Sequence, residues 1–100
     1  MVHLAAHAPR HRRENLVAMS DEWTRLDVRA QDLRKEPPAH VTVDWILRRQ
    51  AAIREAMLET PAATMAGVGA KHRIATAQND ALDEDLLESA ESDVVRLVYA

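Results

Sequence analysis

The sequence contains no cysteine and no phenylalanine, and only two of its 100 residues are glycine. Without cysteine, the chain cannot form a disulfide, a thiolate nucleophile or a zinc finger. It also lacks Asn-Gly and Asp-Gly pairs and clear runs of alternating apolar and polar residues, which are the main signals of β-hairpins. These absences predict an all-α protein.

Long apolar runs and catalytic motifs are lacking too. The apolar stretches fall far short of the roughly 18 residues that a membrane helix requires, and the apolar stretch within the first eight residues is too short for a signal peptide. No glycine-rich phosphate loop is present, and no serine lies in a strand–turn–helix elbow. We therefore expect a cytoplasmic protein that is not an enzyme and that uses no cofactor, small-molecule substrate or membrane.

The apolar content consists largely of small side chains. Alanine accounts for 18 residues, whereas leucine, valine and isoleucine together account for 22. Alanine favours helix but buries little apolar area. A core of this composition predicts an elongated helical bundle, or a bundle that a partner completes.

The stretch 10–36 carries the clearest pattern in the chain. Its apolar residues recur at steps of three and four, the spacing of a heptad seam along which one helix packs against another. The seam consists of Leu16, Met19, Trp23, Leu26, Ala30 and Leu33. A helix of this length measures about 40 Å, which is long for a chain of this size, and we therefore expect self-association along the seam.

Prolines and capping residues divide the rest of the chain. Pro37 and Pro38 end the first helix, and further helices are expected at 42–59, 61–78 and 80–99, the third capped by Thr60. Residues 1–9 are expected to form a flexible tail before a single helical domain at 10–100. The first two helices predict a long, coiled-coil-like hairpin that two shorter helices follow.

Apolar stripes predict the inner faces of the later helices. In the second helix, Val43, Ile46, Gln50, Ile53 and Met57 repeat the spacing, and Trp45 is expected to be the bulky counterpart of Trp23. In the third, Met65, Val68, His72 and Ala75 share a face, and small residues there allow another helix to come close. The fourth helix has the stripe Leu82, Leu86, Ala90, Val94 and Leu97, with Leu87 and Val98 beside it.

Charge is unevenly distributed along the chain. The net charge is −3, and seven of the 16 acidic residues lie between residues 80 and 93. The acids Asp80, Glu84, Glu88 and Glu91 form one edge of the last helix, which could dock on a basic partner or imitate a phosphate backbone. No glycine follows these acids, and the spacing does not fit a calcium-binding loop.

Basic residues and histidines raise two further hypotheses, a nucleic-acid-binding surface and a metal site. Residues 63–77 resemble a helix-turn-helix weakly, and with the neighbouring cations they could form a nucleic-acid surface from Arg48, Arg49, Arg54, Lys71 and Arg73. His3, His7 and His11 have helical spacing, but Pro9 interrupts it and no carboxylate completes a site, so no metal is expected. We expect a solvent-exposed cluster at Arg10, Arg12 and Arg13.

Two segments resemble a known group of proteins. The segment DEWTRLD at residues 21–27 and the segment TPAATMAGVGAKHR at residues 60–73 resemble motifs of short hypothetical helical bacterial proteins, some of them encoded near prophage or mobile-element genes. The likeness covers residues 21–98. It implies a helical fold and an accessory role, and no catalytic residue is carried over from it because that group has no established activity.

Taken together, the patterns predict a non-enzymatic helical protein–protein interaction module that self-associates through its first helix. One alternative is a phage-type nucleic-acid-binding accessory, similar to a small packaging subunit. Another is an inhibitor that docks its acidic helix on a nucleic-acid-binding enzyme.

Overall fold

Four helices make up the part of the chain that the structure, a computed structural model, describes: the backbone of residues 2–35, 40–78 and 81–99, and the side chains of residues 15–35, 42–78 and 81–99. The helices are α1 (Val2–Arg34), α2 (His40–Glu59), α3 (Met65–Ala75) and α4 (Glu84–Tyr99). No strand occurs within these residues. The prediction of an all-α protein is confirmed.

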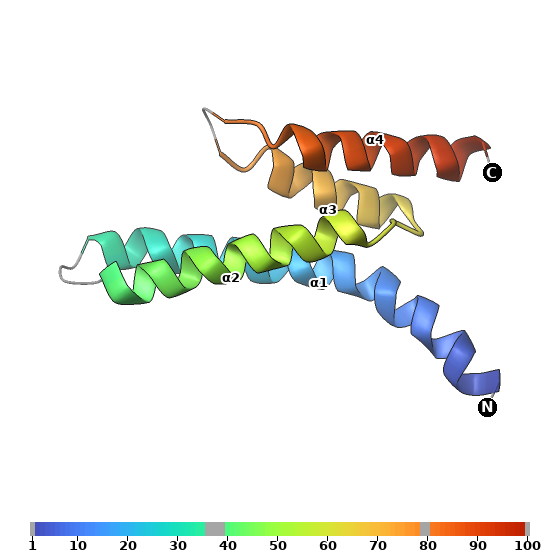
Figure 1. The fold of residues 1–100 in the computed structure, drawn as a ribbon, viewed down its shortest axis with the longest axis horizontal. Coiled ribbons are helices and arrows are strands. Elements are labelled where there is room, and N and C mark those ends of the chain that lie inside the picture. The colour runs from blue at the N-terminus through green and yellow to red at the C-terminus, as the bar shows by residue number, and fades with distance from the viewer. Residues whose placement is uncertain (1, 36–39, 79–80, 100) are drawn as a thin grey trace.

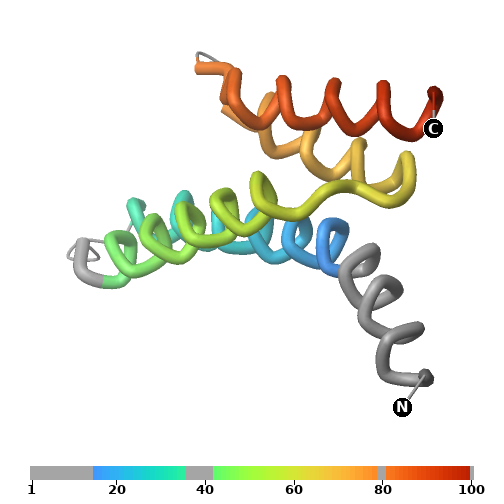
Figure 2. Tube along the Cα trace, turned by 45° about the vertical axis from the view of Figure 1, so that its right-hand side comes forward, coloured from blue at the N-terminus to red at the C-terminus, as the bar shows by residue number. Residues whose placement is uncertain are grey.

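The helices form two antiparallel pairs (Figure 1). In both views α1 lies beside α2, and α3 lies beside α4 (Figures 1 and 2). The pairs meet mainly through α1 and α3, and less extensively through α2 and α4. Each helix therefore has two main neighbours, and the interface between α2 and α4 is the least extensive of the four main interfaces.

Two helices begin later than the sequence predicts. The Thr60 hydroxyl donates to the Ala56 carbonyl at 2.7 Å and so completes the end of α2, whereas Thr64 is the N-cap of α3 and accepts from the Gly67 N–H at 3.2 Å. The expected cap at Thr60 is therefore wrong. Similarly, α4 begins at Glu84, after Asp83 accepts from the Leu86 N–H at 3.2 Å.

The first two helices begin earlier than predicted. α1 extends back to Val2 and includes Pro9, and α2 begins at His40. Residue 1, residues 36–39 and the side chains of 2–14 lie outside the described part of the chain. That part therefore does not contain the side chains of the three N-terminal histidines and of Arg10, Arg12 and Arg13, and the flexible tail stays a prediction.

The core follows the heptad pattern of α1 and the stripe of α2. Leu16, Ile53, Met57 and Leu86 are each at most 3% exposed. The central members are buried hydrophobic side chains from all four helices and the α2–α3 connection: Leu16, Trp23, Ile53, Met57, Ala62, Val68, Ala70, Ile74, Ala75, Leu86 and Ala90. This core holds α3 against α1 on one side and against α4 on the other.

Several residues expected in the core are on the surface. Trp45 is 61% exposed because it precedes Ile46 by one residue and lies off the buried stripe of α2. Met65 and His72 are exposed as well, since α3 turns Lys71, Ile74 and its small residues inward. The exposed apolar side chains also include Leu82 and Val98, both placed in or beside the predicted stripe of α4.

Gly67 allows α1 and α3 to approach closely. A Cβ atom at Gly67 would lie 3.0 Å from Leu16 Cδ1 and 3.1 Å from Ala62 Cβ. Ordinary van der Waals contact needs about 3.5 Å or more between carbon atoms. The expectation that small residues in this segment let another helix come close is confirmed at Gly67, whereas Gly69 faces open space.

Candidate interaction surfaces

The predicted seam of α1 contacts the chain's own helices. Leu16, Trp23 and Ala30 are buried, while Met19, Leu26 and Leu33 are partly buried. Gln50 Nε2 of α2 donates to the Trp23 carbonyl at 3.2 Å, and Leu16 contacts the start of α3. Much of the apolar area of the seam is therefore used within one copy of the protein.

The five cations of the predicted nucleic-acid surface each have a carboxylate partner. The pairs are Arg48–Asp44 at 2.5 Å, Arg49–Glu22 at 2.8 Å, Arg54–Asp83 at 2.5 Å, Lys71–Asp93 at 2.6 Å and Arg73–Asp21 at 3.3 Å. A carboxylate within 4 Å offsets much of the positive field that a cation presents to phosphate. Lys71, moreover, is 1% exposed and does not present its ammonium group at the surface.

Lys71 is the centre of a polar network between α3 and α4. Its Nζ donates to Asp93 Oδ2 at 2.6 Å and to Ser89 Oγ at 2.9 Å. Arg96 Nη2 donates to Asp93 Oδ1 at 3.0 Å and also to the Ala62 carbonyl in the α2–α3 connection. The network therefore joins α3, α4 and the α2–α3 connection.

Asp93 is stabilised as a carboxylate by these contacts. Burial raises its pKa, but the hydrogen bonds from Lys71 and Arg96, together with the backbone of Ala62, outweigh burial and hold the pKa below the ordinary value of 3.8. The buried pair therefore contributes its charge interaction at neutral pH. Removing either partner would leave an uncompensated charge in the interior.

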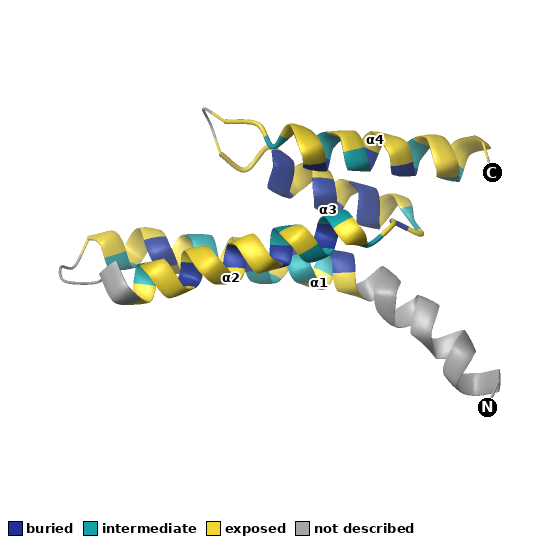
Figure 3. Cartoon of the chain, in the orientation of Figure 1, coloured by how far each residue is buried: buried dark blue, intermediate teal, exposed yellow. Residues whose placement is uncertain are grey.

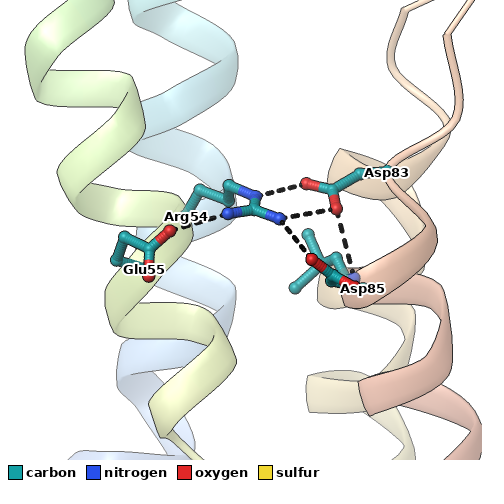
Figure 4. Close-up of polar contacts among 5 residues, drawn as sticks. Arg54, Glu55, Asp83 and Asp85 are labelled. Carbon is teal, nitrogen blue, oxygen red and sulfur yellow. Dashed lines mark hydrogen bonds and ion pairs between the residues drawn. The ribbon is translucent and has the colours of Figure 1, made fainter.

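A second ion pair closes the α2–α4 interface (Figure 4). The guanidinium of Arg54 contacts both oxygens of Asp83, at 2.5 and 2.9 Å, and also contacts Glu55 and Asp85. Its hydrogen bonds lower the pKa of Asp83. Asp83 thus caps α4 and ties its first turn to α2 with the same carboxylate.

A cavity of about 210 Å³ lies beside this ion pair. Trp23, Leu47 and Ile74 supply apolar walls, while Gln50, Arg54 and Asp83 supply polar groups. Arg54 and Asp83 are bonded to each other, and Gln50 is bonded to the Trp23 carbonyl. The side chains of Gln50, Arg54 and Asp83 are therefore engaged within the protein.

The outer face of α4 carries both acidic and apolar side chains. The name outer face of α4 denotes six exposed residues that share an arc of about 100° on the helix: Glu84, Glu88, Glu91, Val95, Val98 and Tyr99. The acids occupy the N-terminal half, and the apolar residues occupy the C-terminal half, with Val95 56%, Val98 63% and Tyr99 83% exposed. Figure 3 shows α4 exposed along much of its length. The predicted docking residues Glu84, Glu88 and Glu91 lie together here, whereas Asp80 lies outside the described residues.

Within the described residues, no group of three or more His, Asp or Glu side chains is arranged to hold a metal ion. None of the described helices is both long enough and apolar enough to cross a membrane.

Comparisons with protein-family models, with curated proteins and with solved structures found no match to this chain. The resemblance to short helical bacterial proteins therefore stays a prediction.

The Lys71–Asp93 pair is a feature that the sequence patterns did not predict. Asp93 interrupts the stripe formed by Leu86, Ala90 and Leu97, at steps of four, three and four residues. A carboxylate at such a position indicates a buried partner. Lys71 lies four residues after Gly67 and three before Ile74, and both of these residues are buried. This spacing places Lys71 on the inner face of α3 and could have identified it as the buried partner.

Proposed function

We propose that this chain is a non-enzymatic helical protein–protein interaction module that associates with a second copy of itself. The outer face of α4 carries the proposal, because three exposed apolar side chains follow three exposed acids along one side of the helix. Apolar side chains exposed together on one face are typical of interaction surfaces. The adjacent acids add a charge pattern that can select a partner and fix its orientation.

The first helix has two roles in the proposed function, which are packing against α2 and self-association. Its seam from Leu16 to Leu33 is proposed to pack in a coiled-coil-like manner against α2, which supplies Ile46, Ile53 and Met57 as buried partners. Self-association through the first helix is then left to the seam residues that are only partly buried, Met19, Leu26 and Leu33. This division is supported by the burial of Leu16, Trp23 and Ala30 within one chain.

A second candidate function is docking of α4 on a basic protein, such as a nucleic-acid-binding enzyme that the acidic helix would inhibit. It is favoured by the exposure of Glu84, Glu88 and Glu91 on one side of the helix. A nucleic-acid-binding role is less favoured, because the five cations named for it are paired with carboxylates. The cytoplasmic location and the phage-related role expected from the sequence remain proposals.

Cysteine labelling tests the proposed function directly, because the chain has no cysteine of its own. Val95 and Val28 are 56% and 55% exposed, and they provide a matched pair of sites. We expect a maleimide to label the Val95→Cys variant several-fold more slowly at high protein concentration than at low concentration. The Val28→Cys variant should react at one rate throughout. Equal, concentration-independent rates for both variants would contradict self-association through this face.

A further inference from the structure

We propose that the cavity beside the Arg54–Asp83 ion pair binds a small arylalkylamine, in which a short chain joins an aromatic ring to an ammonium group. The inference goes beyond the proposed function. The cavity measures about 210 Å³, and an apolar cavity of about 150 Å³ takes up one benzene molecule. The space is therefore large enough for one aromatic ring with a short chain.

The walls of the cavity come from three helices. The apolar walls are Trp23 of α1, Leu47 and Ala51 of α2, and Ile74 of α3. Trp23 is 8% exposed and Ile74 is 5% exposed, and both belong to the hydrophobic core. Aromatic rings pack favourably against one another in offset or edge-to-face arrangements. Trp23 therefore favours an aromatic ligand over an aliphatic ligand of the same size.

Gln50 places an amide oxygen at the wall of the cavity. The residue is 5% exposed, and its Nε2 donates to the Trp23 carbonyl at 3.2 Å. Because a carbonyl only accepts hydrogen bonds, this contact fixes the orientation of the amide.

The oxygen of this amide is available to a ligand. Within the described residues, no donor reaches Gln50 Oε1. The oxygen is not fully enclosed either, because Ser20 Oγ is the one fully enclosed side-chain N or O atom of these residues that has no partner. Since Gln50 lines the cavity, an N–H group of a ligand there can donate to this oxygen.

The edge of the cavity nearest α4 carries an excess of negative charge. The guanidinium of Arg54 contacts three carboxylates, those of Asp83, Asp85 and Glu55 (Figure 4). One positive and three negative charges leave two negative charges in excess. Among the described residues, Asp83 Oδ2 accepts from Arg54 Nε alone, and a carboxylate oxygen has room for a second donor. An ammonium group at this edge gains both a hydrogen bond and a charge interaction.

A second, more open hollow shares this edge. It measures about 440 Å³, shares Gln78, Ala81 and Asp83 with the cavity, and adds Glu84 and Asp85 as acidic walls. Acids around an opening raise the local concentration of cations. The charges at the edge therefore favour a cationic ligand over a neutral or an anionic ligand of the same shape.

The fluorescence of Trp23 tests this site. A Trp45→Phe background removes the other tryptophan, which is 61% exposed, and leaves Trp23 as the single tryptophan reporter. Phenethylamine, phenethyl alcohol and phenylacetate provide a cationic, a neutral and an anionic probe with the same ring. We expect a saturable change in Trp23 emission with phenethylamine, about tenfold weaker binding of the alcohol, and no binding of phenylacetate.

Two neighbouring alanines of α2 provide matched variants in this background. Ala51 and Ala52 are both exposed, but of the two only Ala51 lines the cavity. The Ala51→Phe side chain would fill the cavity and should abolish binding of phenethylamine, whereas the Ala52→Phe variant should bind it as the background does. Circular dichroism checks the helix content, and Ala51→Leu provides a smaller filling side chain if Ala51→Phe lowers it.

Three results would overturn the proposal. Without a saturable change on addition of phenethylamine, the cavity is not an arylalkylamine site. Equal binding of phenethylamine and phenylacetate would exclude recognition of the ammonium group. Equal binding by the Ala51 and Ala52 variants would place the bound amine outside the cavity. Each of these results leaves self-association through α4 unaffected, because the site and its readout lie within one copy of the chain.

Discussion

At the scale of single residues, the interior depends on one buried ion pair. Lys71 and Asp93 are 1% and 5% exposed, and they join α3 to α4 through a 2.6 Å contact. Such pairs are costly to form, because both ions leave water, but breaking one by removing a partner is also costly. The pair therefore specifies how α3 and α4 pack, even though its net contribution to stability is small.

Replacing Lys71 with methionine should lower the free energy of unfolding by about 3 kcal/mol, because Asp93 would remain buried with Arg96 as its remaining cationic partner. Replacing both residues, as Lys71→Met with Asp93→Leu, should restore most of that loss. The control Lys35→Met removes a surface pair whose lysine side chain is 77% exposed, and it should cost less than about 1 kcal/mol. Urea unfolding measures all three. A single Lys71→Met variant as stable as the control would contradict the buried pair.

The depressed pKa values of Asp93 and Asp83 predict acid sensitivity. A carboxyl whose pKa is lower in the folded state than in the unfolded state adds stability above its unfolded value of 3.8. That stability is lost as the pH falls below about 4. The free energy of unfolding should therefore fall as the pH is lowered below about 4. Replacing Lys71 with methionine and Asp93 with leucine should flatten the fall, and an unchanged pH profile would count against the assigned role of Asp93.

At the scale of elements, the periodic spacing of apolar residues predicted burial better than the capping residues predicted where helices begin. The heptad spacing placed Leu16, Trp23 and Ala30 in the interior because an inward-facing seam repeats every three or four residues. Trp45 was misplaced because its size, rather than its position beside Ile46, suggested burial. The start of α3 was misplaced because Thr60 and Thr64 both offer a capping hydroxyl, and only the tertiary arrangement decides between them.

The interaction surfaces were less predictable than the core. Glu84, Glu88 and Glu91 could be placed on one side of a helix from spacing alone, and the structure confirms that all three are exposed. Lys71 was assigned to a surface because most lysines lie there. Its burial depends on Asp93, which is 22 residues away in the chain. Local periodicity can place Asp93 and Lys71 on inner faces of their helices, but it does not tell which residue pairs with which.

The two glycines of α3 should respond oppositely to alanine. Gly69→Ala should raise the free energy of unfolding by about 1 kcal/mol, because alanine favours helix and the new methyl group meets open space. Gly67→Ala should lower it by about 1 kcal/mol, because the methyl group would press on Leu16 and Ala62, which are both 0% exposed. Thermal or urea unfolding compares the two. Equal stabilisation by both substitutions would show that α1 and α3 are not in close contact at Gly67.

At the scale of the whole molecule, the four helices divide their apolar surface between two uses. The α1 seam, the α2 stripe and the inner residues of α3 and α4 form one core within the chain. Val95, Val98 and Tyr99 remain outside it, on the same side of α4 as three acids. We therefore propose that the inner faces stabilise the fold and that the outer face of α4 mediates self-recognition.

The most direct test of this account is the mass of the native protein in solution, measured by light scattering across a dilution series. We predict twice the chain mass of 11.2 kDa at high concentration, with dissociation toward the single-chain mass on dilution. A constant mass of 11.2 kDa at every concentration would contradict self-association, and the exposed face of α4 would then be left to a different partner.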